Sequence, residues 1–146
     1  MIFTHKENKI LPYKADLLYN IIADVENYPH FIPWVSGVEV LRAYENKKDF
    51  EIQVDFKLIK EKFSTTDTFY KNERIEIVLL EGPFNKLNSN WSFKKIDDHH
   101  TLVDFDIELE LKSKSLSFLF MPLFGKAQQK IFNSFEDRAK AMAKFS

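Results

Sequence analysis

The segment Val103-Asp-Phe-Asp-Ile-Glu-Leu-Glu-Leu111 alternates apolar and acidic residues without interruption. Successive side chains of a β-strand point to opposite faces, so the apolar side chains share one face and the carboxylates share the other. The pattern predicts a strand with one buried and one solvated face. Such strands are typical of antiparallel sheets that cover a core on one side only.

The same alternation recurs in five earlier segments, separated by short breaks that are polar or contain Gly and Pro. Its apolar positions are Val38 and Val40, Phe50 to Phe56, Phe63 to Phe69, Ile75 to Leu79, and Leu87 to Phe93. The breaks fall at residues 44–48, 71–74, 81–84 and 97–100. Together with residues 103–111, these segments predict an antiparallel meander of about six strands.

Beyond the meander, the apolar residues adopt the period of a helix. From Leu119 to Phe145, one stripe contains Phe120, Leu123, Phe124, Ala127, Ile131, Phe135, Arg138, Ala139 and Met142. The stripe predicts a long amphipathic C-terminal helix that packs on the sheet. Pro122 is expected in its first turn, where a missing N–H group costs no hydrogen bond.

The residues before the meander predict a strand and two short helical segments. Residues 9–12 end a short opening strand, and Leu17 to Ala23 has helical spacing with Asp16 as a candidate N-cap. Pro29 and Pro33 then permit only a short turn of helix. Because the helices are segregated from the strands, the expected class is α+β, with residues 1–146 as a single domain.

Composition limits the class of protein and the kinds of site. Hydrophobic residues make up 45% of the chain, cysteine is absent, and the formal net charge is −1. These values exclude disulfide-rich and disordered classes, thiol catalysis, Cys-ligated zinc, and a broad cationic field for DNA. No targeting pattern or membrane-spanning segment is visible, so we expect a bacterial cytoplasmic protein.

Motifs at three places resemble those of the coenzyme-Q-binding START-domain family, whose bacterial members include the RatA-type proteins. Ile22-Ala-Asp-Val-Glu-Asn-Tyr-Pro-His-Phe-Ile-Pro33 is similar to the family motif Asp-Val-x-x-Tyr-Pro-x-Phe-Leu-Pro. Glu81-Gly-Pro-Phe-Asn-Lys-Leu-Asn-Ser-Asn-Trp-Ser-Phe93 is similar to its Gly-Pro-Phe, Leu and Trp-x-Phe pattern. Phe135-Glu-Asp-Arg-Ala139 resembles its Phe-x-x-Arg-Ala motif.

The resemblance implies a START-like helix-grip fold. In this fold a curved antiparallel sheet of about seven strands surrounds a long C-terminal helix, and two short helices follow the first strand. It also implies a hydrophobic tunnel that binds or delivers ubiquinone for respiration, and it does not imply catalysis, so we expect a non-enzyme that requires no cofactor. The alternative is a RatA-type toxin that binds the large ribosomal subunit. Both functions use the same fold, so the fold does not choose between them.

Candidate tunnel residues are the large apolar side chains on the inward stripes and in the loop before the meander. They are Phe31, Pro33, Trp34, Phe56, Phe69, Leu79, Trp91, Phe93, Phe105, Phe120, Phe124, Ile131 and Phe135. Each could instead belong to an ordinary core, because buried Phe is common there. Asp67 and Arg138 fall on the same stripes, where they could pair with each other or contact the head group of a ligand.

Two further segments suit contact with a membrane surface. Residues 28–34 concentrate aromatic rings, either as a lid on the sheet edge or as a tunnel mouth, and residues 118–124 could form the other side of that mouth. From Lys112 onward, seven cations and two acids give a net charge of +5, which suits an anionic membrane, rRNA or simple solvation. The protein would be cytoplasmic, or peripheral at the inner face of the membrane beside respiratory complexes.

Catalytic and metal-binding motifs are missing from the sequence. His5, His30, His99 and His100 lack metal-ligand spacing, and adjacent side chains in a turn, such as those of His99 and His100, would diverge. No Gly-rich phosphate loop, nucleophile elbow or His-Glu-x-x-His sequence is present. We therefore expect a binding protein; an enzyme on this fold would need a polar, titratable cavity.

Overall fold

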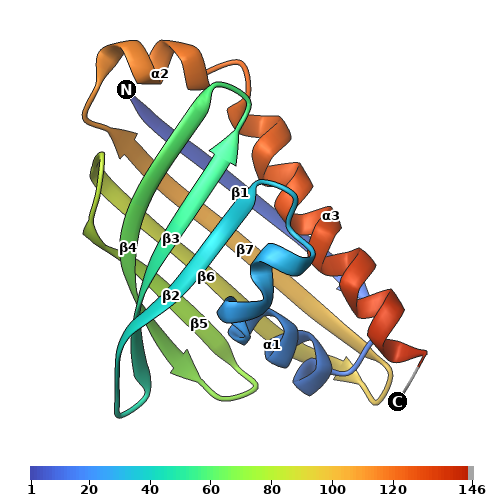
Figure 1. Ribbon diagram of the computed structural model, residues 1–146. Helices are drawn as coiled ribbons and strands as arrows, with labels where there is room; N and C mark the ends of the chain where they lie inside the picture. The colour runs from blue at the N-terminus through green and yellow to red at the C-terminus, as the bar shows by residue number, and fades with distance from the viewer. Residues whose placement is uncertain (145–146) are drawn as a thin grey trace.

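The computed structural model describes residues 1–144. Along this part of the chain the elements are β1 (Ile2–Leu11), α1 (Ala15–Ala23), the 3₁₀ helix η1 (Val25–His30), β2 (Val35–Tyr44), β3 (Lys47–Phe56), β4 (Ile59–Tyr70), β5 (Arg74–Glu81), β6 (Phe84–Asp97), β7 (His100–Leu111), α2 (Lys114–Phe120) and α3 (Phe124–Ala143). Figure 1 shows α3 running along the sheet, with α2 at one end of the molecule and α1 towards the other.

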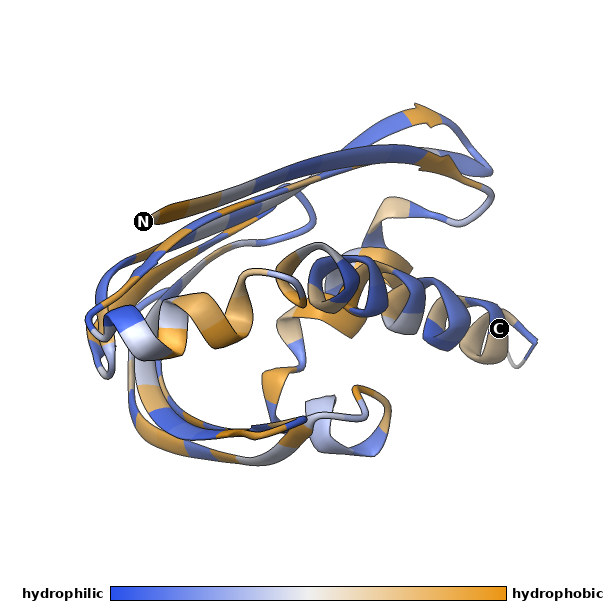
Figure 2. Ribbon diagram, turned by 90° about the horizontal axis from the view of Figure 1, so that it is seen from above, coloured by the Kyte–Doolittle hydropathy of each residue, from blue (hydrophilic) through white to orange (hydrophobic). Residues whose placement is uncertain are grey.

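Within residues 1–144, the strands form one seven-stranded antiparallel sheet in the order β1-β7-β6-β5-β4-β3-β2. β1 pairs with β7 along its whole length, from Ile2 opposite Glu110 to Leu11 opposite Thr101. Viewed from above, the sheet bends so that its two ends face each other across the helices (Figure 2). The predicted α+β layout and the meander are confirmed.

Helix α1 begins earlier than the sequence predicts. Its N-cap is Lys14, which makes no capping hydrogen bond through its side chain, and Asp16 is the second helical residue. The expectation that Asp16 caps the helix is therefore wrong. Its carboxylate instead accepts a 2.8 Å hydrogen bond from the backbone N–H of Leu17, which places a negative charge at the positive end of the helix.

The C-terminal helical region is divided in two, which corrects the prediction of one helix from Leu119. Ser113 caps α2 by accepting a hydrogen bond from the Leu116 N–H at 3.1 Å, and α2 ends at Phe120. Pro122 lies between α2 and α3, not in a first helical turn, because its ring and missing N–H interrupt a continuous helix. Phe145, the predicted end of the helix, lies outside the described residues.

Two hydrophobic clusters fill the ends of the space between sheet and helices. One packs α1 and the C-terminal half of α3 on the sheet, and at its centre the Trp91 ring stacks on Phe105 with 4.3 Å between centroids. The other surrounds Phe3 and Phe124, whose ring centroids are 5.2 Å apart, below the junction of α2 and α3. The middle of the concave face is left for the cavity described next.

Candidate functional site: an apolar cavity with buried polar groups

A cavity of about 210 Å³ lies between the concave face of the sheet and the helices. Its wall is built by inward-facing residues of β3 to β7, by η1 and the start of β2, and by α2 and α3. Because the inward positions of the strands are apolar, the wall is almost entirely apolar. The space is suited to a hydrophobic group rather than to bulk water.

Some of the predicted tunnel residues line this cavity. These are Trp34, Phe56, Trp91, Phe105, Phe120, Ile131 and Phe135, together with the polar candidate Asp67. They come from both walls, the sheet and the C-terminal helices. The inward stripes of the sequence therefore meet across one cavity.

The other predicted residues lie outside the cavity wall. Phe93 is buried under α1, where its ring meets the ring of Tyr19 edge to face, and Phe124 packs on Phe3. Pro33 is exposed, and Phe69 and Leu79 pack against the two core clusters. Apart from Pro33, these residues face inward as predicted, but they pack in the core clusters and not on the cavity wall. Phe93, Phe124, Phe69 and Leu79 therefore fit the alternative given above, that a tunnel candidate belongs to the ordinary core.

The aromatic loop before β2 packs inward. The Phe31 ring contacts the rings of Tyr28 and Phe135 edge to face, at centroid distances of 5.8 and 5.4 Å. The Trp34 ring packs against the Phe56 ring, with 5.7 Å between the ring centroids. These rings close one end of the cavity and pack on α3 and β3, which agrees with a lid rather than with rings facing a membrane.

Arg138 does not pair with Asp67 within residues 1–144. Its guanidinium carbon lies 5.4 Å from the centroid of the Phe31 ring, a cation–π contact at the rim of the aromatic lid. It is also absent from the cavity wall. The predicted ion pair is wrong, and Arg138 holds the loop against the end of α3.

Asp67 is the most deeply buried carboxylate of the wall, with 2% of its surface exposed. Its Oδ1 accepts a 2.7 Å hydrogen bond from the hydroxyl of Thr65. Burial raises its pKa from 3.8 to about 7; the Thr65 hydrogen bond lowers it in part, and the charge of Asp49 raises it further. The Asp67 carboxyl group therefore titrates near neutral pH in the wall of an apolar cavity.

Tyr28 brings a second titratable group to the same wall. Its hydroxyl donates a hydrogen bond to the backbone carbonyl of Ile22, which fixes the ring over the end of α1. Burial raises the pKa of this hydroxyl well above its usual value, and the charges of Asp67 and Asp24 raise it further. Tyr28 therefore stays neutral and acts as a hydrogen-bond donor to the protein itself.

Gln128 was missed by the sequence analysis. It lies on α3 with 3% of its surface exposed, and it lines the cavity. Its position, four residues after Phe124 and three before Ile131, is on the apolar stripe and could have identified it. Among the described residues, neither its Oε1 nor the Nε1 of Trp34 has a hydrogen-bond partner, although both atoms are buried.

An exposed apolar patch lies at the α2 end of the molecule. It consists of Leu58 in the β3–β4 turn, 82% exposed, and Phe118, Leu119 and Met121 around α2, with Phe118 65% exposed. Figure 1 places the turn and α2 at the same end of the fold. We call these residues the α2-end patch. Phe120 and Phe124 of the same segment face inward instead.

No helix among residues 1–144 is long and apolar enough to span a membrane. The α2-end patch is a separate feature, a surface that a membrane or another protein could contact. Exposed apolar residues gathered at one end of a fold are typical of interaction sites.

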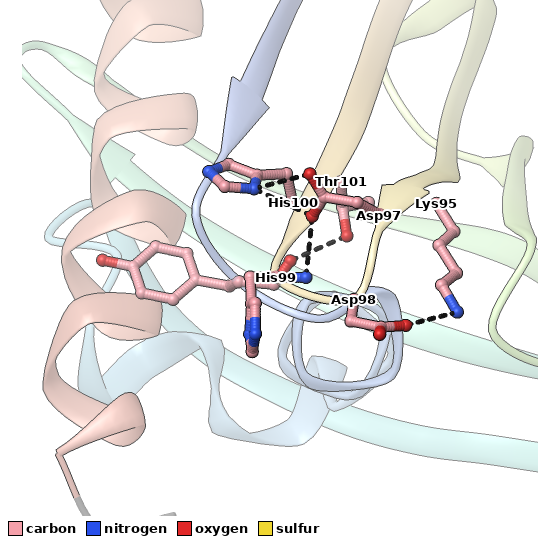
Figure 3. Close-up of polar contacts among 7 residues, drawn as sticks. Lys95, Asp97, Asp98, His99, His100 and Thr101 are labelled. Atoms are coloured by element: carbon pink, nitrogen blue, oxygen red, sulfur yellow. Dashed lines mark hydrogen bonds and ion pairs between the residues drawn. The ribbon is translucent and has the colours of Figure 1, made fainter.

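The histidines in the β6–β7 turn lie away from the cavity. Figure 3 shows the ring of His100 turned towards Asp97, with Nδ1 2.9 Å from Oδ1, while the ring of His99 points away. The His99 N–H donates to the same Oδ1 at 2.8 Å, and these hydrogen bonds lower the pKa of Asp97. In the part of the chain that the structure describes, no group of three His, Cys, Asp or Glu side chains could hold a metal ion.

Sequence comparison identifies the family. The family described as "Polyketide cyclase / dehydrase and lipid transport" matches residues 11–136, most of the chain. The chain belongs to this family. This match agrees with the START-like resemblance of the three sequence motifs.

Relatives of this START-like protein carry names of two kinds. "Ribosome association toxin RatA" of Pseudomonas aeruginosa is 29% identical over 140 residues, which cover 95% of this chain and 97% of that protein. "Coenzyme Q-binding protein COQ10 homolog B, mitochondrial" of Xenopus laevis is also 29% identical over 140 residues, which cover 92% of this chain and 57% of that protein. The names of these relatives refer to ribosome association and to coenzyme Q.

Solved structures confirm the helix-grip fold of the START-like protein. The 18 kDa protein CC1736 of Caulobacter crescentus is 35% identical with a TM-score of 0.79, and the match covers 97% of this chain and 99% of that one. The Zhui aromatase/cyclase of a Streptomyces species is 14% identical with a TM-score of 0.84, over 96% and 94% of the two chains. At this identity the aromatase/cyclase shares the fold, and its activity does not transfer.

Proposed function

We propose that the protein is a non-catalytic carrier that binds ubiquinone or a similar isoprenoid lipid and supports respiratory electron transport. The observation that carries this proposal is the apolar cavity of about 210 Å³ between sheet and helices. The 29% identity to a protein named for coenzyme Q binding supports the same ligand class. An aromatic wall with a few buried polar groups is typical of a site for an apolar ligand with a small polar head.

The size of the cavity suits the head group rather than a long tail. Sites for drug-sized ligands typically measure about 300–1,000 Å³, so 210 Å³ holds a substituted ring and the first part of a chain. The remainder of an isoprenoid tail would leave between Leu116, Phe120 and the β3–β4 turn, where the α2-end patch begins. A tail lying on that patch would remain in contact with apolar side chains.

Peripheral contact with a membrane is part of this proposal. Exposed lysines lie near the α2-end patch in sequence, Lys57 and Lys60 on either side of Leu58, and Lys114 and Lys126 before and after the α2 residues, with one exposed carboxylate, Asp55, close by in sequence. An apolar patch among cations suits an anionic lipid surface. The cavity and the patch would then lie in line, so that a ligand could pass between protein and bilayer.

Tryptophan fluorescence tests ligand binding directly. The chain has two tryptophans, Trp34 and Trp91, and both line the cavity. Titration with the short-chain analogue decylubiquinone, without detergent, should quench both with a 1:1 end point. The Ala127→Phe variant, which fills the cavity, should lose this quenching, whereas Ala141→Phe on the exposed face of α3 should keep it. Equal quenching of both variants would contradict binding in the cavity.

A second candidate is association with ribosomes. Relatives named "Ribosome association toxin RatA" from Pseudomonas aeruginosa and Escherichia coli align with 95% and 90% of the chain. The net charge of +5 from Lys112 onward suits contact with rRNA. Sedimentation through a sucrose gradient separates the two candidates, because only this one predicts comigration with large subunits and loss of assembled ribosomes.

A further inference from the structure

The carboxylate of Asp67 has one oxygen without a hydrogen bond. Its Oδ1 accepts from Thr65, whereas within residues 1–144 its Oδ2 accepts from no group. In the same part of the chain, the polar side-chain atoms that are both closed off from water and unpartnered belong to Trp34 and Gln128, and Oδ2 is not one of them. Because Asp67 lines the cavity, its Oδ2 opens onto that space.

The neighbouring strands do not neutralise Asp67. On β3, Lys48 lies opposite Asp67 in the sheet register, but among the described residues no ion pair joins the two. Asp49, also on β3, is a like charge and raises the pKa of Asp67. On the other side, β5 places the apolar Ile77 opposite it. The sheet therefore supplies no cation that would hold Asp67 in its ionised form.

The helices beside the cavity do not neutralise Asp67 either. Tyr28 of η1 stays neutral, because burial raises the pKa of its hydroxyl, and that hydroxyl donates to the Ile22 carbonyl. From α3 the uncharged Gln128 lines the cavity, and the cation Arg138 contacts the Phe31 ring and does not line the cavity. Hydration is thus the remaining source of stabilisation for a negative charge on Oδ2.

A ligand in the cavity would remove that hydration. An ionised carboxylate needs hydrogen-bond donors at both oxygens, and Oδ2 can obtain them only from water that enters the cavity. A ligand that fills the space beside Asp67 excludes this water. Loss of hydration penalises the charged form of a carboxyl group much more than the neutral form. The bound ligand should therefore raise the pKa of Asp67 further above its value of about 7.

We propose that an apolar ligand enters the cavity together with a proton on Asp67, so that ligand binding is coupled to proton uptake. This inference rests on the proposed function and describes how that site is regulated. It holds for either part of a quinone beside Asp67. An isoprenoid segment excludes water, and a quinone carbonyl needs the O–H donor that only the protonated carboxyl group has. Loading would then be favoured at an anionic membrane surface, where protons are concentrated.

Titration with decylubiquinone at several pH values measures the coupling. The oxidised quinone has no group that titrates between pH 6 and pH 9, so a pH-dependent Kd reports on the protein. The complex binds more protons than the free protein, so affinity falls as pH rises through 7, and Kd should increase about tenfold from pH 6 to pH 8. Calorimetry in phosphate and in Tris, which differ in heat of ionisation, should show uptake of about 0.9 proton per ligand at pH 8 and about 0.1 at pH 6.

Variants assign the proton to a residue. Asp67→Asn has no carboxyl group to protonate, so it should bind decylubiquinone without proton uptake and with the same Kd at pH 6 and pH 8. Glu61→Gln removes a second carboxylate of the cavity wall, one that is only half-buried, and should retain the proton uptake. The exposed Asp104→Asn variant should also retain it. Thermal unfolding confirms that each variant is folded.

The outcomes separate the coupling from the carrier function. A wild-type Kd that does not change with pH, without proton uptake, would overturn the coupling and leave the carrier function intact. Uptake that persists in Asp67→Asn and disappears in Glu61→Gln would overturn the assignment to Asp67. Failure of decylubiquinone to bind at any pH would overturn the carrier function itself, and the coupling with it.

Discussion

The hydroxyl of Thr65 donates a 2.7 Å hydrogen bond to the carboxylate of Asp67, and both side chains are buried in the wall of the cavity. They are two residues apart on β4, so they lie on the same face of the strand. This hydrogen bond supports the ionised form, but burial is the larger effect, and the pKa of Asp67 is about 7. Thr65 and Asp67 are therefore a polar pair in an otherwise apolar site, and the Asp67 carboxyl group titrates near neutral pH.

Replacing Asp67 should change how stability depends on pH. Because its folded pKa of about 7 exceeds the usual 3.8, the folded state binds more protons between these values, and stability falls as pH rises through 7. Asp67→Asn should stabilise the protein at pH 8 by up to about 4 kcal/mol and leave it nearly unchanged at pH 4.

Urea unfolding at pH 4, 6 and 8 measures this difference. The exposed Asp104→Asn variant is the control and should follow the wild type at each pH. Parallel curves for Asp67→Asn and the wild type would mean that Asp67 is ionised without cost, contrary to the account above.

The glycine at the β5–β6 turn should not tolerate a side chain. Gly82 has φ +151°, and a Cβ added there would lie 2.6 Å from the Cβ of Phe63 and 3.2 Å from its Cα. Gly82→Ala should destabilise the protein by about 2–3 kcal/mol. Gly125 on α3 has open space around it, so Gly125→Ala should instead stabilise by up to about 1 kcal/mol. Chemical unfolding of both variants checks the opposite signs.

A buried threonine joins the β6–β7 hairpin to the segment before α1. Thr101 is fully buried, and its hydroxyl donates a 2.7 Å hydrogen bond to the backbone carbonyl of Tyr13, as Figure 3 shows in part. Thr101→Val keeps the shape and leaves that carbonyl unpaired, so we expect a loss of about 1–3 kcal/mol in the free energy of unfolding. The same change at the exposed Thr4 should cost less than about 0.5 kcal/mol, and equal costs would contradict the role of the hydrogen bond.

Membrane binding should depend on the α2-end patch. Phe118→Ser combined with Met121→Ser should reduce recovery on anionic lipid vesicles at least about fivefold without changing stability, because both side chains are exposed. Val78 and Leu80 on β5 are similarly exposed, and their replacement by Ser is the matched control. If the control lost as much binding as the patch variant, contact would not be specific to the α2 end.

The period of apolar residues predicted most of the fold. Alternation identified the strands because each buries only one face, and breaks in the pattern located most of the turns. The tight β3–β4 turn at Lys57 and Leu58 was not among the predicted breaks, because it contains neither Gly nor Pro and its single polar residue is followed by apolar Leu58 and Ile59. The division between α2 and α3 was missed because the apolar stripe continues across Pro122, whereas hydrogen bonding does not.

The site was predicted less completely, for a physical reason. Periodicity shows which side chains face inward, but it does not show which of them neighbouring side chains separate from the cavity. Phe93 and Phe124 face inward and are covered by Tyr19 and Phe3. Gln128 was overlooked because a polar residue on a helix is usually solvated, although its position on the apolar stripe of α3 indicated the buried side chain that the structure shows.

Arg138 shows a further limit of spacing. Its place on the stripe of α3 suggested Asp67 as a partner, but its guanidinium makes a cation–π contact with the lid ring of Phe31. A long side chain can turn along the helix axis, so its partner depends on the loop packed beside it.

The central claim is that the cavity holds an isoprenoid quinone, and the most direct measurement is the lipid content of the protein itself. The protein should be purified without detergent from a quinone-producing host, extracted with organic solvent and analysed by mass spectrometry, with Ala127→Phe purified in parallel. The account predicts ubiquinone in near-equimolar amount with the wild type and little with the variant. Absence of quinone from the wild type, together with no uptake of added decylubiquinone, would contradict it.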